Sequence, residues 1–371
     1  MAFGQTFDAF YSSLATSCDI DTITEYLQQF EDLGIKELNN AGLDDTKDWI
    51  VGKYQDWGYT DIVEDDFTVS GIVTTNVIVT KTGTLYPDTY VIIDGHYDTK
   101  NGPGANDNGS GTVILLELAR LIKDIPTEYS IQFVHFSAEE IGLEGSEHYV
   151  DNIANPNNMD IKVLFNIDQV GGTGGETNNT IVCERDQSPP STNDMQSDIM
   201  TNELVTCTQL YSNLQTVISF AYGSDYVPFM TNGYVVTGFY EYNDSPLTHT
   251  INDSISGVDL PYLHEVTKAS MGALLHYSVA YQENSIDEHL LGALTIAPNP
   301  ATDVIQLKTK GMELAEMHVT ISDITGAVVK NERISQENHV FELNIESLAH
   351  GTYVVQVETE YGTATERFVK E

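Results

Sequence analysis

Histidine and acidic side chains follow several predicted strands of this sequence directly. His96 comes after the strand TYVIID, the acidic pair at 139–140 after IQFVHFSA, and Asp168 after KVLFNI. Asp107 lies in the glycine-rich segment GANDNGSG just before a predicted helix, and His249 closes the loop after YVVTGFYEY. In open α/β sheets, functional sites lie beyond the carboxyl ends of the strands. We therefore expect these side chains to meet at one edge of one sheet.

The chemistry of these side chains indicates a metal-dependent hydrolase. Imidazole and carboxylate ligands without thiolates suit zinc in a hydrolytic site. Two histidines, one bridging carboxylate and two further carboxylates would complete two metal sites that share a water molecule. Paired metals about 3.5–4 Å apart activate such a water and polarise a carbonyl group together. An acidic pair alone would indicate a solvated surface in so acidic a chain, and the prediction depends on the whole set.

The elements that must position these residues alternate between strand and helix up to residue 283. Helices are predicted over 21–34, 43–58, 109–122, 142–153, 224–233 and 259–283, and the strands between them are rich in β-branched residues. Near-continuous apolar strands between helices indicate a mostly parallel, mixed central sheet with helices on both faces. The predicted fold class is therefore α/β, with residues 1–283 as one large domain that carries the candidate metal ligands.

The pattern changes after this domain. Residues 284–293 are predicted to form a linker, and residues 294–371 contain only short strands separated by turn signals. This is typical of a small all-β sandwich. Because the second domain carries no set of catalytic side chains, we interpret it as an address or an anchor. The alternative is a carbohydrate- or protein-binding sandwich.

Composition argues against some classes of partner and leaves open whether a disulfide bond forms. The net charge of −40, from 16 basic and 56 acidic residues, argues against nucleic acid and anionic membranes. No apolar run is long enough for a membrane-inserted helix, and no signal peptide is visible. Cys183 and Cys207 could form a disulfide in an oxidising compartment, or could remain buried thiols like Cys18.

Five segments over roughly residues 20–283 resemble the co-catalytic zinc aminopeptidases related to bacterial leucyl aminopeptidase, peptidase family M28. They are DGHYDT, GANDNGSG, FSAEEIGLEGS, NIDQVGG and SPLTHT. The resemblance implies two Zn²⁺ ions per chain, both bound by Asp107. His96 and Asp168 would complete one site, and Glu140 and His249 the other. It also implies removal of N-terminal amino acids from peptides with a free amino terminus, by a metal-bridged hydroxide.

The same resemblance implies further roles. Glu139 would be the general base, taking a proton from the water and passing it to the leaving amine. Asp98 would hydrogen-bond to the ring of His96 and fix its tautomer, and Asp253 would play a similar supporting role. Tyr222 would stabilise the oxyanion. The free amino terminus would dock beside the metal held by His96 and Asp168.

Three further positions are notable in light of this family. The Asp107–Asn108 peptide matches a position where the family has a cis bond, and we predict one here. Gln169 stands where a methionine is usual, and residues 224–226 read Ser-Asp-Tyr where Ser-Asp-His is frequent. Both departures are expected near the substrate pocket, so they bear on side-chain preference.

The final domain has a resemblance of its own. The segments APNPATDVIQL, ISDITGAVV, NIESLAHGTYVVQV and RFVKE resemble the C-terminal sorting domain recognised by type IX secretion machinery. This implies that the secretion machinery is a partner, that the domain is cleaved, and that the enzyme is extracellular or on the cell surface.

Three other functions share parts of this pattern. A two-zinc carboxypeptidase or amidohydrolase usually inserts a dimerisation domain before its last histidine, and too few residues separate Asp168 from His249 for one. A glutaminyl cyclase is close in fold but uses a single zinc, whereas both His96 and His249 are present here. A non-enzymatic receptor-like domain would have lost metal ligands, and none is missing.

Overall fold

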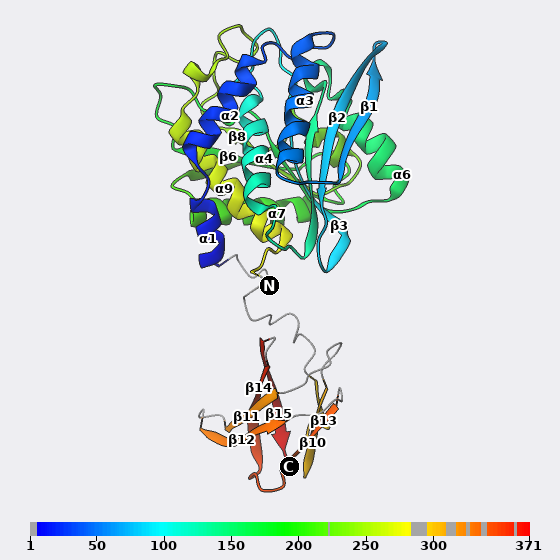
Figure 1. The fold of residues 1–371 in the computed structure, drawn as a ribbon, viewed down its shortest axis with the longest axis vertical. Helices are drawn as coiled ribbons and strands as arrows, with labels where there is room; N and C mark the ends of the chain where they lie inside the picture. The colour runs from blue at the N-terminus through cyan, green and yellow to red at the C-terminus, as the bar shows by residue number, and fades with distance from the viewer. Residues whose placement is uncertain are drawn as a thin grey trace. The chain divides into compact units, whose positions relative to one another are not determined.

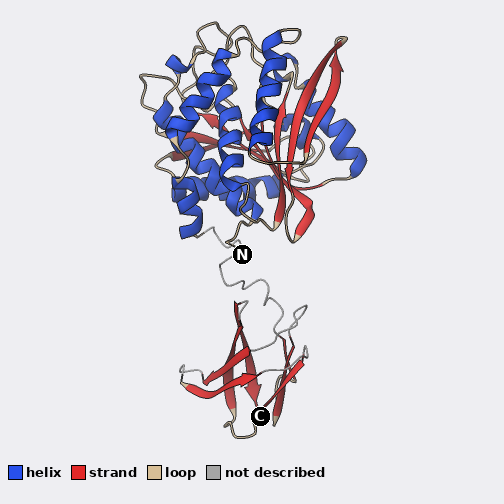
Figure 2. Ribbon diagram, viewed as in Figure 1, coloured by secondary structure: helices blue, strands red, loops and turns tan. Residues whose placement is uncertain are grey.

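The computed structural model describes residues 6–221, 223–282, 295–308, 317–323, 327–334, 340–359 and 362–371. The chain forms two compact units, residues 1–281 and 282–371. The first is an α/β unit and the second contains only strands among its described residues (Figures 1 and 2). Each unit is considered separately below.

Eight strands of the first unit pair into one mixed sheet in the order β1-β2-β4-β3-β5-β8-β6-β7. The strands are β1 (Ile62–Val69), β2 (Ile72–Lys81), β3 (Tyr86–His96), β4 (Tyr129–Phe136), β5 (Asp160–Ile167), β6 (Thr180–Arg185), β7 (Gln215–Phe220) and β8 (Val236–Glu241). Neighbours from β4 to β8 are parallel, whereas β1, β2 and β6 join by antiparallel pairing. The predicted mixed sheet with a parallel centre is confirmed.

Helices cover both faces of this sheet (Figure 2). They are α1 (Ala9–Thr16), α2 (Ile20–Asp32), α3 (Ala41–Asp56), α4 (Gly109–Ile122), α5 (Glu144–Tyr149), α6 (Asn155–Asn157), α7 (Asp194–Tyr211), α8 (Tyr226–Thr231) and α9 (Leu260–Ser278). Successive strand residues point to opposite faces. Accordingly, Val91 and Ile93 of β3 join the core beneath α2, α4 and α9, while Ile92 joins the core beneath α5 and α8. Packing in both cores therefore fixes the position of this central strand.

Helices α1, α6 and α7 and strands β1 and β6 were not predicted from the sequence. Strand β1 carries three consecutive acidic residues, 64–66, which obscure its alternation even though Phe67 and Val69 are buried. Strand β6 is short, and α7 has no side-chain hydrogen bond at its N-cap. Their tertiary packing, rather than local signals, defines them.

The second unit consists of two antiparallel sheets. One has the order β13-β10-β9 and the other β12-β11-β14-β15. Their bounds are β9 (Thr295–Ala297), β10 (Val304–Lys308), β11 (Met317–Asp323), β12 (Val328–Ile334), β13 (Val340–Asn344), β14 (Gly351–Thr359) and β15 (Gly362–Lys370). Leu307 and Leu343 of the first sheet share one buried cluster with Val319, Val355 and Phe368 of the second. This is the arrangement of a β-sandwich.

None of the three cysteines forms a disulfide bond in the structure. Cys18, Cys183 and Cys207 are all buried and free, so the thiol alternative holds in this structure. Among the described residues, no helix combines the length and apolarity needed to cross a membrane.

Two helical glycines should respond in opposite ways to alanine. At Gly272 of α9, a Cβ atom would lie 2.8 Å from Cγ of Tyr211, so Gly272→Ala should destabilise the protein by about 1–3 kcal/mol. At Gly52 of α3 no atom lies within 4 Å of such a Cβ, so Gly52→Ala should stabilise it by about 0.5–1 kcal/mol. Urea unfolding of both variants checks the prediction, and a stabilising Gly272→Ala would contradict it.

Candidate metal centre

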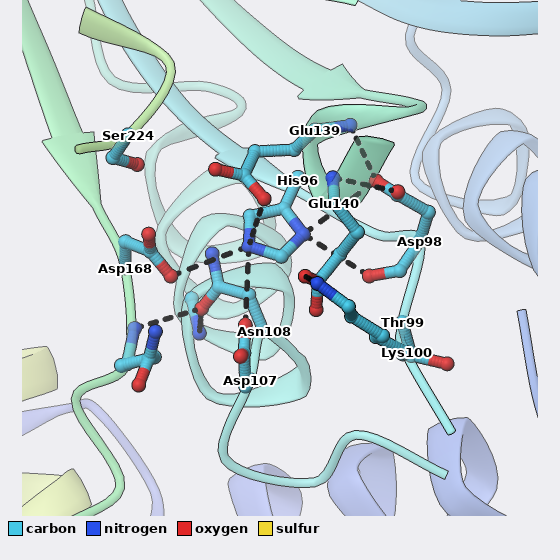
Figure 3. A network of polar contacts seen from close by, with 12 residues as sticks. His96, Asp98, Thr99, Lys100, Asp107, Asn108, Glu139, Glu140, Asp168 and Ser224 are labelled. Atoms are coloured by element: carbon cyan, nitrogen blue, oxygen red, sulfur yellow. Dashed lines mark hydrogen bonds and ion pairs between the residues drawn. The ribbon is translucent and has the colours of Figure 1, made fainter. Parts of the chain in front are cut away.

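The carboxyl ends of three adjacent parallel strands, with two neighbouring loops, deliver the predicted ligands to one place. Strand β3 ends at His96, the 3-10 turn Glu139–Ile141 follows β4, and Asp168 follows β5 directly. Asp107 precedes α4, and His249 lies in the loop that follows β8. Figure 3 shows the carboxylates of Asp107, Glu139 and Asp168 around the ring of His96. All five predicted ligands are therefore brought together.

Asp107 lies between the two imidazoles. Its Oδ1 is 3.3 Å from Nε2 of His96, and its Oδ2 is 3.0 Å from Nε2 of His249. Asp168 Oδ1 lies 3.3 Å from the same nitrogen of His96, and Glu140 Oε2 lies 2.9 Å from that of His249. Each imidazole thus has one carboxylate of its own and shares Asp107 with the other. This is the geometry of two adjacent ligand sets with a common bridging residue.

Two groups of three potential ligands are present among the described residues, and within each group the ligand atoms lie within 4.8 Å of one another. One is Asp107 with Glu140 and His249, which matches one predicted set. The other joins His96 and Asp168 to Glu139, the predicted base, whose Oε2 is 3.9 Å from Nε2 of His96. Glu139 therefore lies within reach of the same cation position as these two ligands.

The electrostatics of the cluster fit divalent cations. His96, Asp107 and Asp168 are almost completely buried, and Oε1 of Glu140 is buried without a hydrogen-bond donor. Burial, followed by repulsion from Asp107, raises the pKa of Glu140 to about 9, and burial raises the pKa of Glu139 to about 8. Buried carboxylates are stable when paired or bound to metal. Imidazoles and carboxylates without thiolates form a donor set suited to zinc.

Asp98 contacts the site differently from the prediction. Nδ1 of His96 is 3.0 Å from the main-chain oxygen of Asp98, while the carboxylate Oδ1 is 3.5 Å away. The two carboxylate oxygens instead accept hydrogen bonds from the backbone N–H groups of Glu139 and Glu140, at 3.1 and 3.2 Å. Asp98 thus orients the imidazole mainly through its backbone, and its side chain holds the acidic turn.

Hydrogen bonds among three loops hold Asp107 in place. Asp253 accepts the backbone N–H of Asn106 at 2.8 Å and that of Asp107 at 3.0 Å. Asn106 donates through Nδ2 to Glu241 Oε1 at 3.0 Å, and Glu241 Oε2 accepts from the N–H of Gly172 at 2.7 Å. Sequence reasoning missed Asn106 and Glu241. The rule that functional side chains lie at the carboxyl ends of strands would have identified Glu241, because it is the last residue of β8.

Four non-glycine residues around the site adopt left-handed backbone conformations. They are Ala138 (φ 63°), Leu143 (φ 62°), Gln169 (φ 49°) and His249 (φ 57°). Residues held in such conformations persist where the surroundings enforce them, and they cluster at functional sites. Ala138 and Leu143 lie on either side of the acidic turn, Gln169 follows Asp168, and His249 is itself a predicted ligand. The packing around these residues therefore helps to determine where the predicted ligands point. The predicted cis bond between Asp107 and Asn108 is present.

Only some of the residues predicted near the substrate pocket line the cavity at the site. Gln169 lines a cavity of about 280 Å³ together with the ligand carboxylates, and the hydroxyl of Tyr240 donates to its Oε1 at 3.3 Å. Ser224 hydrogen-bonds to Asn166, and Asp225 and Tyr226 are buried. None of these three residues lines that cavity. Tyr222 lies outside the described residues.

The fold and site define a class, an α/β metallohydrolase with a two-part histidine–carboxylate centre. The chain belongs to peptidase family M28, whose model matches residues 76–274. Residues 295–371 match the secretion system C-terminal sorting domain. Both resemblances stated from the sequence are therefore confirmed.

Curated relatives of this chain include aminopeptidases. It is 34% identical over 187 residues to "Aminopeptidase YwaD" of Bacillus subtilis, covering 48% of this chain and 39% of that protein. It is 32% identical over 170 residues to "Aminopeptidase Y" of Saccharomyces cerevisiae, covering 45% of this chain and 30% of that protein. The chain thus spans less than half the length of these relatives.

Solved structures with the same fold carry more than one activity. The LapA aminopeptidase of Legionella pneumophila is 18% identical with a TM-score of 0.65, covering 76% of each chain. A glutaminyl cyclase of Fimbriiglobus ruber is 17% identical with a TM-score of 0.56, covering 69% of this chain and 95% of that one. At these identities the likeness shows the fold alone, so the reaction must be argued from the site.

The role of Asp253 can be tested through metal affinity. Asp253→Ala would leave two backbone N–H groups beside Asp107 without their acceptors, and should weaken zinc binding by about 10–100-fold. Competition with a chromophoric chelator measures the affinity. Asp186→Ala is the matched control, because this buried carboxylate also accepts a backbone N–H, that of Ser188, away from the ligand loops. Equal losses in both variants would contradict the assignment.

Proposed function

We propose that this protein is a secreted two-zinc aminopeptidase that removes N-terminal amino acids from peptides. The observation that carries the proposal is the position of Asp107, whose two oxygens face the two imidazoles of His96 and His249 on opposite sides. A carboxylate in that position can hold two cations at once. The aminopeptidase relatives support the reaction class.

In this proposal, each cation has its own ligands besides the shared Asp107. His96 and Asp168 hold one, and Glu140 and His249 hold the other. When bound, a pair of zinc ions would activate a water molecule and polarise the scissile carbonyl group. The buried half of the site, at His96 and Asp168, receives the free amino terminus of the substrate.

Glu139 moves the proton. It receives a proton from the attacking water and gives it to the leaving amine. The backbone N–H of Glu139 donates to Asp98, which holds the turn that carries this carboxylate. Tyr222 is proposed to stabilise the oxyanion, as the family resemblance implies.

The second unit is proposed to direct export. Its match to a secretion sorting domain supports recognition by type IX machinery, cleavage of the domain, and a final location outside the cell or on its surface. The described residues of this unit form a separate β-sandwich with its own core, which is compatible with an independent recognition module.

Substitution of Glu139 separates catalysis from metal binding. Glu139→Gln keeps the side-chain shape but removes the base, so turnover should fall by about 10²–10⁴-fold while zinc remains at two ions per chain. Hydrolysis of aminoacyl p-nitroanilides and metal analysis on the same sample measure both quantities. His249→Ala should lose metal and turnover together. Full activity of the glutamine variant would remove the base assignment.

The choice of substrates distinguishes the competing reactions. An aminopeptidase should cleave a free aminoacyl p-nitroanilide and leave its N-acetylated form intact, because the amino terminus must dock at the His96–Asp168 half of the site. A carboxypeptidase or a glutaminyl cyclase would cleave neither p-nitroanilide. One zinc ion per active chain would also exclude the two-metal proposal.

Export can be tested with a reporter. Residues 283–371, fused behind a fluorescent protein that carries a periplasmic signal peptide, should direct the reporter out of a bacterium that has type IX machinery. The matched control is the same fusion without residues 295–371, which should remain in the periplasm. Equal retention of both reporters in the periplasm, seen by fractionation, would overturn the localisation.

A further inference from the structure

A second cavity adjoins the candidate metal centre on the side of Glu140. It has a volume of about 260 Å³, and its lining includes Leu38, Thr99, Lys100, Glu140 and Ile141. The first cavity, of about 280 Å³, is also lined by Glu140. Glu140 therefore forms part of the wall of both cavities, which places the second cavity beside the first.

Lys100 brings a positive charge to the second cavity. Its Nζ lies 3.8 Å from Oε2 of Glu140, and 45% of its side chain is exposed (Figure 3). Once Glu140 serves as a metal ligand, its negative charge is shared with the cation, and the ammonium group is available to another anion. The lysine thus lies beside the reacting centre with donors that a bound substrate can reach.

The backbone on either side of Lys100 is held firmly. Thr99 donates its N–H to the carbonyl of Lys36 at 3.2 Å, and its hydroxyl oxygen accepts the N–H of Lys36 at 3.0 Å. Asn101 donates its N–H to Oε1 of Glu37 at 2.8 Å. Besides Glu140, the cavity wall carries the carboxylates of Glu37 and Asp98. The Asn101 contact occupies one oxygen of Glu37, and both oxygens of Asp98 accept backbone N–H groups of the acidic turn. Because the backbone is held at both neighbours, the ammonium group can move only by rotation within the Lys100 side chain.

Exposure indicates which part of a peptide reaches Lys100. The side chains of His96 and Asp168 are 1% and 6% exposed, whereas that of His249 is 44% exposed. An enzyme that cuts at a chain end must enclose that end and let the remaining chain leave toward solvent. The enclosed end therefore lies at His96 and Asp168, and the leaving portion passes His249 and Glu140.

We infer that Lys100 is a specificity-determining residue that binds a carboxylate on the leaving portion of the substrate. The preferred substrates are peptides with an acidic group directly beyond the scissile bond. That group is either an acidic side chain at the second position or the terminal carboxylate of a dipeptide. The inference rests on the proposed aminopeptidase function and names its substrate class.

Matched substrates test this with the zinc-loaded full chain. The first residue of each peptide, written X, is the amino acid whose p-nitroanilide the enzyme cleaves fastest. To test a side-chain carboxylate at the second position, the rate for X-Glu-NH₂ is compared with that for X-Gln-NH₂. X-Gly is compared with X-Gly-NH₂ for the terminal carboxylate. In the wild type, kcat/KM should be higher for the acidic member of at least one pair. Lys100→Met should lower that ratio by about fivefold, chiefly through KM, because a partly exposed ion pair is lost.

Two control variants isolate the charge at this position. Lys100→Arg should restore most of the preference, since it keeps the positive charge. Lys123→Met removes an equal charge at the end of α4, away from the cavity, and should leave the ratio within about twofold of the wild type if long-range attraction is screened by salt. The ratio is measured within each variant, so any change in zinc content cancels.

Each outcome decides between the claims. An unchanged ratio in Lys100→Met, or equal rates for the acidic and neutral substrates in the wild type, overturns the role of Lys100 and leaves the aminopeptidase proposal intact. If the p-nitroanilides and all four peptides remain uncleaved, the aminopeptidase proposal itself fails and the inference falls with it.

Discussion

The physical constraint on which this structure depends is the burial of several carboxylates within a few ångströms of one another. Asp107, Glu139, Glu140 and Asp168 surround two imidazoles at a sheet edge where these carboxylates are mostly shielded from water, although His249 is half exposed. Such a cluster is costly unless positive charge balances it. The rest of the peptidase unit can be understood as the framework that tolerates this cost, because the two cores on either side of the sheet stabilise the strand ends that carry it.

Backbone N–H groups supply much of the local compensation. Asp98 and Asp253 each accept two of them, and Glu241 accepts two more together with an amide side chain. These hydrogen bonds join loops that are distant in the sequence, so the acidic residues that do not bind metal position those that are proposed to do so. Some of the many acidic residues of this chain therefore have a structural role near the site, in addition to any effect on solubility.

The sequence alone was sufficient for the α/β class, the second β domain and the convergence of all five predicted ligands, because strand ends and glycine-rich turns have strong local signatures. It was insufficient where long-range contacts decide. Strand β1 has its alternation hidden by acidic residues, and α7 has weak local signals. The contact of His96 with the backbone of Asp98, rather than with its carboxylate, depends on loop geometry that no spacing encodes. The same holds for the link from Asn106 to Glu241.

The five predicted ligands come from segments that are far apart along the chain, and they meet only when the sheet is complete. An unfolded chain therefore offers no comparable binding site, and a cation held at this edge stabilises the native state alone. The thermal resistance of the protein would then rise and fall with the supply of free metal around it. If the protein is exported as proposed, it would meet that supply outside the cell, where the surroundings rather than the cytoplasm would set its stability.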